Sequence, residues 1–226
     1  MLVLHHLNHS RSQRILWLLE ELHVDYKVTF YERDPVTIRA PKTLKAVHPL
    51  GKSPVITDGD ITVAESGAII EYLLETYDNN GSVSVGDDPQ DKRDERFWLH
   101  FAEGSLMTPL LIAMLFDKIK ESPMPFFVKP IAKGISGKVM SEFVQPEIDG
   151  ILAYIESYLN GKEWFAGGKL SGADFQMSFP LEALVAKEKV SDADYPNIVA
   201  FVKRCQARPA YLTALSKGGQ YDYGPQ

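Results

Sequence analysis

Apolar residues recur at two different spacings along the chain, and the spacing changes near residue 90. Before that point, short runs alternate between apolar and polar side chains, as half-buried strands do, and helical spacing separates them. After it, apolar residues recur every three or four positions and no strand-like run follows. The pattern therefore predicts a mixed α/β domain followed by an all-helical domain.

The N-terminal part predicts the order strand, helix, strand, hairpin, helix. Strands are expected over Leu2–Leu7, Val24–Tyr31, Val55–Thr57 and Ile61–Val63, helices after Ser10 or Ser12 and after Ser66, and one helical turn over Lys42–Val47. Asp58-Gly59 between the last two strands is a typical two-residue hairpin turn. This order is that of a thioredoxin-like domain, in which helices cover a small sheet of parallel and antiparallel strands.

The C-terminal part predicts helices only. They are expected over Asp91–Lys120 with a kink at Pro109, over Val139–Leu159, from Ser171 to about Lys187, and in two pieces after Pro196 and Pro209. Ser171 to Asp174 has the spacing of a capping box, and the glycine- and tyrosine-containing tail is expected to be mobile. We expect a linker at residues 81–89 between domains at residues 1–80 and 90–226.

Composition excludes several classes of function. The net charge of −6 argues against a nucleic-acid binder, which would usually show a basic face. A single cysteine, Cys205, forms no internal disulfide and suits a reducing compartment. No apolar run approaches the ~18 residues of a membrane span, and His5, His6 and His9 interrupt any signal-peptide pattern. We therefore expect a cytoplasmic protein without a nucleic-acid or membrane partner.

The stretch from His48 to Ser66 carries the clearest functional signal. Pro54 precedes a strand, and the Ser53–Pro54 bond is one of the few at which a cis peptide is tolerated. Ser66 is a good helix cap, and free N–H groups at a helix start attract a carboxylate, while Glu65 can hold an ammonium group. A docking edge, an anion site and an ammonium site in one segment suit a small zwitterionic peptide.

These residues resemble a known family. The Gly51–Pro54 turn and the Glu65–Ile69 corner look like the glutathione-binding half of cytosolic glutathione transferases, and Leu7–Leu22 resembles the family's first helix with a serine-type active-site turn. The likeness extends over nearly the whole chain, includes the capping box at Ser171–Asp174, and is to a fungal- or bacterial-like class. It implies the thioredoxin-like domain followed by the all-helical domain, with glutathione as cosubstrate and no permanently bound cofactor.

The resemblance implies a serine hydroxyl that donates a hydrogen bond to the glutathione thiolate at the start of the first helix. Aligning Arg14 with the arginine that often follows this turn makes Ser10 the catalytic residue. A shift of one residue would give the role to His9, and Ser12 remains a second choice. Both serines can also be ordinary helix caps.

Further site residues follow from the same likeness. Glutathione would be held by Ser10, Arg39, Lys52, Ser53, Pro54, Glu65 and Ser66, with Glu65 on its amino group and Ser66 on its γ-glutamyl carboxylate. Met107 and Leu111 would line a pocket for an apolar electrophile. We expect no metal site, because His5 and His6 point to opposite faces of a strand and no cysteine or carboxylate cluster completes a ligand set.

The expected reaction is attack of the glutathione thiolate on an apolar electrophile, or on the peroxide oxygen of an organic hydroperoxide. The resemblance also implies a homodimer with its active site near the boundary between the domains. The alternative is a non-catalytic ligand-binding or interaction protein on the same fold, because a fold alone does not fix a function.

Overall fold

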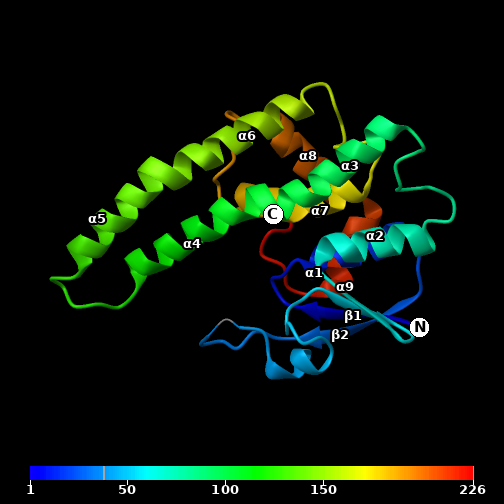
Figure 1. Cartoon of the computed structure of the whole chain (residues 1–226), viewed down its shortest axis with the longest axis horizontal. Coiled ribbons are helices and arrows are strands. Elements are labelled where there is room, and N and C mark those ends of the chain that lie inside the picture. The colour runs from blue at the N-terminus through cyan, green and yellow to red at the C-terminus, as the bar shows by residue number, and fades with distance from the viewer. Residues whose placement is uncertain (38, 226) are drawn as a thin grey trace.

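The computed structural model describes residues 1–37 and 39–225; the expected second domain ends at Gln226, outside this range. A small sheet with its helices forms the N-terminal part, and the rest of the described chain is helical (Figure 1). The thioredoxin-like order and the all-helical second part are both confirmed, and the bounds of the two domains stay a prediction.

The sheet has four strands in the order β2-β1-β3-β4. They are β1 (Leu2–Leu7), β2 (Tyr26–Tyr31), β3 (Val55–Asp58) and β4 (Ile61–Ala64). β1 pairs with β2 in parallel and with β3 antiparallel, and β3 pairs with β4 antiparallel. Asp58 pairs with Ile61, so the hairpin loop is Gly59-Asp60 and the predicted turn at Asp58-Gly59 was one residue too early. The second strand begins at Tyr26 and not at the predicted Val24, because the Val24 N–H bonds to the Leu19 carbonyl and closes the preceding helix.

Among the described residues of this part, the sheet is accompanied by the helices α1 (Ser12–Glu21) and α2 (Ser66–Tyr77) and by the 3-10 turn η1 (Lys42–Ala46). Ser66 is the first helical residue, and the cap position belongs to Glu65, so the prediction that Ser66 caps the helix is wrong. The cap of α1 is Arg11, although the Ser10 hydroxyl does accept a hydrogen bond from the first helical N–H. The Ser53–Pro54 bond is cis, as the sequence suggested.

The C-terminal part consists of α3 (Pro89–Phe101), α4 (Met107–Glu121), α5 (Lys129–Val139), α6 (Gln145–Leu159), α7 (Gly172–Ala186), α8 (Pro196–Gln206) and α9 (Pro209–Gly218). One-turn π segments, η2 (Ala102–Leu106) and η3 (Met140–Val144), join α3 to α4 and α5 to α6. The irregularity expected at Pro109 therefore lies just before it. Proline has no N–H for the carbonyl four residues earlier, Ser105, which is inside η2.

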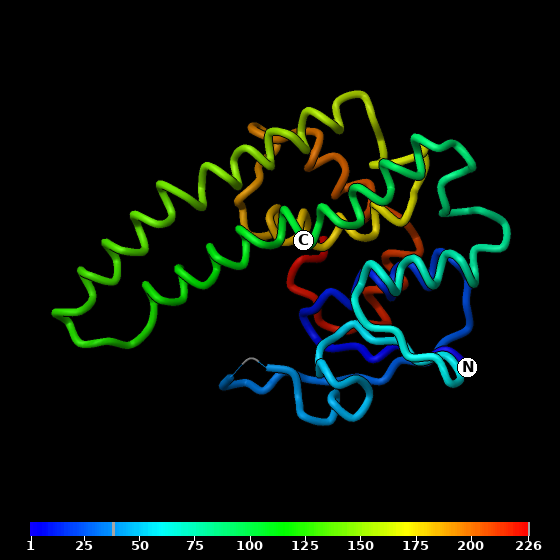
Figure 2. The backbone as a smooth tube through the Cα atoms, in the orientation of Figure 1, coloured from blue at the N-terminus to red at the C-terminus, as the bar shows by residue number. Residues whose placement is uncertain are grey.

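The helix predicted from Val139 begins ten residues earlier, at Lys129, and this prediction was too short. Pro130 occupies the first turn of α5, where an N–H has no intrahelical partner, so proline starts the helix instead of preventing it. α4 and α5 consequently form a long hairpin that projects from the body of the molecule (Figures 1 and 2).

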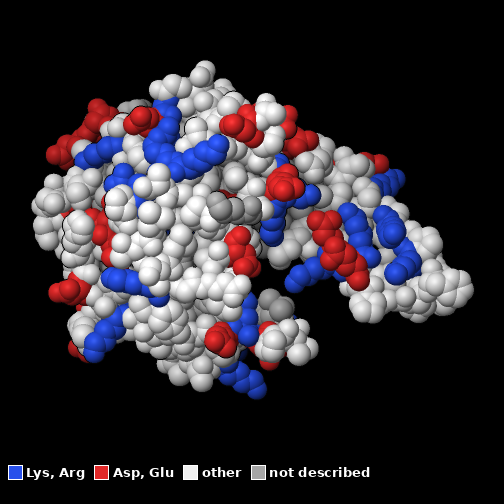
Figure 3. Space-filling model, turned by 180° about the vertical axis from the view of Figure 1, so that it is seen from behind, with Lys and Arg blue, Asp and Glu red and all other residues white. Residues whose placement is uncertain are grey.

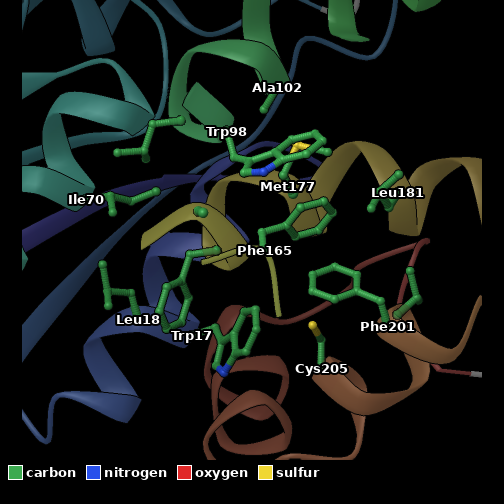
Figure 4. Close-up of a cluster of buried hydrophobic side chains, with 14 of the residues drawn as sticks. Trp17, Leu18, Ile70, Trp98, Ala102, Phe165, Met177, Leu181, Phe201 and Cys205 are labelled. Carbon is green, nitrogen blue, oxygen red and sulfur yellow. The ribbon is translucent and has the colours of Figure 1, made fainter. Parts of the chain in front are cut away.

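One hydrophobic core runs through both parts. Trp17 of α1 packs against Phe175 of α7 and Tyr211 of α9, with ring centroids 4.4 and 5.5 Å apart. Figure 4 shows Trp17 and Leu18 facing side chains from the helical part, including Phe165. Because α1 is held between the two parts, the turn at its start has a fixed position relative to both.

Two local predictions concern the C-terminal part. The capping box is present: the Ser171 N–H and hydroxyl both reach Asp174 Oδ2 at 2.8 Å. The tail after α9, expected to be mobile, is packed and runs beside the turn that follows β1 (Figure 2). There, Asp222 Oδ2 lies 3.1 Å from His9 Nδ1, and the Tyr221 hydroxyl donates to Glu182 at 2.8 Å.

The continuous helical run Pro89–Glu121 is long and apolar enough to cross a membrane, judged by length and composition alone. Its apolar window is interrupted by Glu103, so the expectation of no uninterrupted apolar run holds. Core helices of soluble proteins pass the same test, and this run packs against α7 along part of its length.

Candidate active site

Three strands meet at one end of the sheet. His5 of β1 lies opposite Val55 of β3, which lies opposite Ala64 of β4. The turn after β1, the residues before β3 and the residues after β4 are therefore neighbours. These segments carry five of the seven predicted glutathione ligands, Ser10, Ser53, Pro54, Glu65 and Ser66, and also Ser12, the second choice for the catalytic residue.

The two candidate serines occupy the start of α1 and touch each other. Their hydroxyl oxygens are 2.7 Å apart, and Ser10 Oγ also accepts from the Ser12 N–H at 3.2 Å. Ser12 is fully buried, with Oγ 2.9 Å from His6 Nδ1 and 3.3 Å from the Leu7 carbonyl. Ser10 is 4% exposed and is the serine nearer to solvent.

His6 sets the direction of this hydrogen-bond chain. Burial lowers the pKa of His6 to about 4, although a hydrogen bond to the Gly218 backbone partly opposes the shift. The ring is therefore neutral near pH 7 and has one N–H, which the Gly218 carbonyl accepts. His6 Nδ1 is then an acceptor, so we assign Ser12 as its donor and Ser10 as the donor to Ser12.

Ser53 and Pro54 lie beside β1. The Ser53 hydroxyl donates to the His5 carbonyl at 2.9 Å, and Pro54 is buried. The side chain of Ser53 is thus used to join this segment to β1. Only the backbone N–H and C=O groups of Ser53 are then left to bind an extended peptide.

Glu65 adopts a backbone conformation that is rare for its residue type. Its φ and ψ are 72° and 124°, outside the regions that L-residues with a Cβ favour. Such conformations cost about 1–3 kcal/mol and cluster at functional sites. Glu65 is exposed, Ser66 behind it is buried, and the N–H groups of the first turn of α2 begin here.

The two remaining predicted ligands are not brought into contact with the others. Arg39 lies in the loop between β2 and η1 and Lys52 in the turn before β3, and both are exposed. Within residues 1–37 and 39–225, no ion pair or hydrogen bond is formed by either side chain. That same range contains no group of three His, Cys, Asp or Glu side chains placed to share a metal ion.

Two arginines share one carboxylate beside the turn. Arg11 Nε lies 2.9 and 3.0 Å from the two oxygens of Glu103, and Arg14 Nη2 lies 2.7 Å from one of them. Arg14 is fully buried and also donates to the side-chain carbonyl of Gln176. Both guanidiniums lie over the Phe179 ring, with carbon-to-centroid distances of 5.5 and 5.3 Å.

The charges of this cluster do not cancel. Burial alone would raise the pKa of Glu103, but Arg14 and Arg11 together hold that pKa below its usual range. Two guanidiniums then face one carboxylate, and burial raises the pKa of nearby Glu182 to about 7, which reduces its negative charge. The cluster of Arg11, Arg14 and Glu103 at the start of α1 consequently carries a net positive charge, which favours a bound anion.

The sequence offered no signal for this cluster. Glu103 lies 92 residues from Arg11 inside a run that predicts ordinary helix, and its placement depends on the π segment η2. π segments occur frequently at functional sites, and this one brings a carboxylate to the turn before α1.

The two residues predicted to line the electrophile pocket differ in their exposure to solvent. Met107 in the first turn of α4 is 8% exposed, and Leu111 one turn later is 44% exposed. Leu111 is therefore the more accessible of the two.

Two family models match this chain. Residues 1–75 match the family model "Glutathione S-transferase, N-terminal domain", and residues 117–209 match "Glutathione S-transferase, C-terminal domain". The chain therefore belongs to the glutathione S-transferase family, whose enzymes use glutathione as cosubstrate and need no permanently bound cofactor.

Individual relatives share both domains. The chain is 34% identical to glutathione S-transferase 1 of Saccharomyces cerevisiae, over 94% of this chain and 93% of that protein. It is 36% identical to glutathione S-transferase 3 of Schizosaccharomyces pombe, over 96% and 88%. A solved glutathione S-transferase from Actinobacillus pleuropneumoniae has a TM-score of 0.77 and 33% identity, with both chains fully covered.

Proposed function

We propose that the enzyme binds glutathione at the carboxyl end of β1 and activates its thiol at Ser10. The supporting observation is the meeting of the α1 turn, the Ser53–Pro54 segment and the Glu65–Ser66 corner at one end of the sheet. The activated thiolate attacks an apolar electrophile or an organic hydroperoxide. The non-catalytic alternative is not favoured, because both domains match a family of enzymes.

The proposed binding pose follows the chemistry of each segment. Glu65 holds the amino group of glutathione, and Ser66 with the N–H groups at the start of α2 holds the γ-glutamyl carboxylate. The backbone of Ser53 pairs with the cysteinyl unit. The exposed cations Lys52 and Arg39 are within the loops that would approach the glycine carboxylate.

Thiol activation has three proposed contributors. Free thiols titrate near pH ~8.5, and lowering this pKa by ~2 units requires roughly 2.7 kcal/mol. The N-terminus of α1 supplies about 0.3–1 kcal/mol. Ser10 donates a hydrogen bond to the sulfur, and the excess positive charge of Arg11 and Arg14 over Glu103 supplies the rest.

The proposed chemical step takes one of two forms, depending on the second substrate. In conjugation, the thiol proton leaves to solvent, the sulfur forms a bond to the electrophilic carbon, and the leaving group departs with its electron pair. In peroxide reduction, the sulfur attacks the terminal oxygen, the alcohol leaves, and a second glutathione reduces the sulfenic acid to yield the disulfide and water. Leu111, with a smaller share from Met107, lines the electrophile side.

We also propose a homodimer, a cytoplasmic location, and domains at residues 1–80 and 90–226 joined by residues 81–89. The dimer proposal is supported by a shallow groove of about 510 Å³ on α3, lined by Arg93, Arg96 and Phe97 among others. Exposed Glu71 and Glu75 on α2 offer the complementary charge.

The test combines binding and turnover. Calorimetry should detect glutathione binding, and Glu65→Ala should weaken it by ~2–3 kcal/mol, the scale of a hydrogen bond to a charged group. Conjugation of a generic aryl halide and reduction of a hydroperoxide should be assayed in parallel. If the protein binds glutathione but shows neither activity, the non-catalytic carrier becomes the favoured alternative. If Glu65→Ala binds glutathione as tightly as the parent, the γ-glutamyl site does not lie at Glu65.

A further inference from the structure

The tip of the α4–α5 hairpin is an exposed aromatic surface. Residues 122–128 connect the two helices at the point farthest from the body of the molecule (Figure 1). Phe126 and Phe127 are 85% and 65% exposed and pack edge to face on each other, with centroids 5.6 Å apart. Burying such a ring is worth about 1.5–3 kcal/mol, so two exposed phenylalanines on a convex tip indicate a surface that a partner covers.

The charges around this tip are opposite in sign to those of the whole chain. From Asp117 to Lys138 there are five lysines and two carboxylates, a net charge of +3, whereas the chain carries −6. Lys120 pairs with Asp117 at 3.0 Å, and Lys138 lies 3.9 Å from Glu142. Lys118, Lys129 and Lys133 form no ion pair within the described part of the chain.

Figure 3 shows this arrangement from behind. Lysine side chains and carboxylates both lie along the hairpin, and its end is free of charged side chains. An apolar end next to unpaired cations has the polarity of a bilayer interface, where aromatic rings lie at headgroup depth and lysines meet anionic headgroups. Each lysine near an anionic surface contributes about 1 kcal/mol to such binding.

We infer that the hairpin tip docks reversibly on an anionic phospholipid surface, inserting Phe126 and Phe127 at the level of the headgroups. This revises the expectation, drawn from the absence of a membrane span in the sequence, that the protein has no membrane partner. A second copy of this chain fits the tip less well, because two-fold pairing of hairpins would bring Lys129 and Lys133 against the same lysines. A convex loop also needs no preformed pocket in a deformable bilayer. The inference is independent of the proposed transferase chemistry and of the predicted α2–α3 dimer face.

The test is sedimentation with lipid vesicles. Vesicles of phosphatidylcholine with about 30% phosphatidylserine should carry the protein down, and vesicles of phosphatidylcholine alone should not. The double variant Phe126→Ala/Phe127→Ala should reduce vesicle binding by roughly tenfold or more. Phe143→Ala is the matched control, because Phe143 is also exposed (70%) but lies in η3, away from the tip, and should bind like the parent.

A second variant separates the electrostatic part. Lys129→Gln/Lys133→Gln should weaken binding and reduce its salt dependence, since screening acts on exposed charges. Unchanged glutathione conjugation in all variants verifies that they are folded. The inference is overturned if phosphatidylserine vesicles do not bind the parent, if the double phenylalanine variant binds as well as Phe143→Ala, or if that double variant changes the sedimentation of lipid-free protein, which would assign the tip to a second copy.

Discussion

At the scale of single residues, the proposed activation of the thiol depends on the hydroxyl hydrogen of Ser10. In the free protein, we assign this hydrogen to the bond that Ser10 donates to Ser12. To donate to a thiolate, Ser10 must therefore give up its bond to Ser12. A hydrogen bond to a charged group contributes ~1.5–3 kcal/mol, and the neutral bond that it replaces contributes ~0.5–1.5 kcal/mol. The net gain is about 1–1.5 kcal/mol.

Ser10→Ala should therefore lower the conjugation rate at neutral pH about tenfold. Part of the loss should return as pH rises toward the free thiol pKa near ~8.5, because glutathione then ionises without help. The measurement is a pH–rate profile of parent and variant at saturating glutathione.

Ser12→Ala serves as the control. It should retain the rate, because it leaves the Ser10 hydrogen available, but it should lose ~1–3 kcal/mol of stability, since buried His6 Nδ1 loses its donor. The opposite result, a lost rate in Ser12→Ala and a retained rate in Ser10→Ala, would make Ser12 the activator.

A second prediction at this scale concerns Arg11 and Glu103, whose variants should shift the pKa of the bound glutathione thiol in opposite directions. Arg11→Gln should raise the pKa of the bound glutathione thiol by roughly one unit, because a nearby cation is lost. Glu103→Gln should lower it, because both guanidiniums then act on the sulfur without a counter-charge. Ultraviolet titration of the bound thiolate measures both. Shifts of the same sign in both variants would mean that the pair does not act on the sulfur.

At the scale of elements, the two π segments share one construction. Pro109 follows η2 and Pro146 follows η3, and in each case the residue four positions earlier, Ser105 or Glu142, lies inside the π segment. Proline has no N–H to offer that carbonyl, and its ring would clash with the carbonyl in a regular α-helix. The wider π turn avoids this clash. η2 consequently turns Glu103 toward Arg11 and Arg14 at the start of α1.

Pro109→Ala should allow η2 to return to α-helical register and move Glu103 away from Arg11. The expected result is a thiol pKa shifted in the same direction as in Glu103→Gln. Pro146→Ala is the matched control, since η3 lies in the hairpin away from the site, and it should leave the thiol pKa unchanged. Equal effects of both prolines would indicate a general loss of stability.

The sequence was sufficient for the elements whose signals are local. Alternating Tyr26 and Val28, the aspartate–glycine turn signal and the capping box at Ser171 each act within a few residues, and they were enough to predict the sheet and α7. The position of the hairpin turn was wrong by one residue, because Asp58 still pairs within the sheet. The sequence was insufficient where the same residue type can either end a helix or begin one. Pro130 looked like a helix stop but lies in a first turn, so ten residues of α5 were missed.

The candidate site divides in the same way. Ser53, Pro54, Glu65 and Ser66 lie next to strand ends, and the hairpin pattern was enough to bring them together. The Arg11–Glu103 contact joins segments 92 residues apart and depends on a one-residue change of helical register. No pattern of neighbouring residues encodes such a contact, so only the folded structure reveals it.

At the scale of the whole molecule, the exposed faces of α2 and α3 predict the assembly. Arg93 and Arg96 line a groove on α3, and Glu71 and Glu75 are exposed on α2. A two-fold axis that places the α3 groove on the α2 face of a second copy would form each charge pair twice, because both copies present the same surfaces. Exposed Phe97 in the groove adds an apolar contact at the centre.

The protein should therefore sediment as a dimer of two 25.3 kDa chains at micromolar concentration. Arg96→Glu should shift it toward monomer, since a carboxylate facing Glu71 of the partner subunit costs several kcal/mol. The double variant Arg96→Glu/Glu71→Arg should restore the dimer, because the reversed pair is again complementary. This rescue distinguishes a direct charge pair from damage to α3. A dimer that survives Arg96→Glu would exclude this face as the interface.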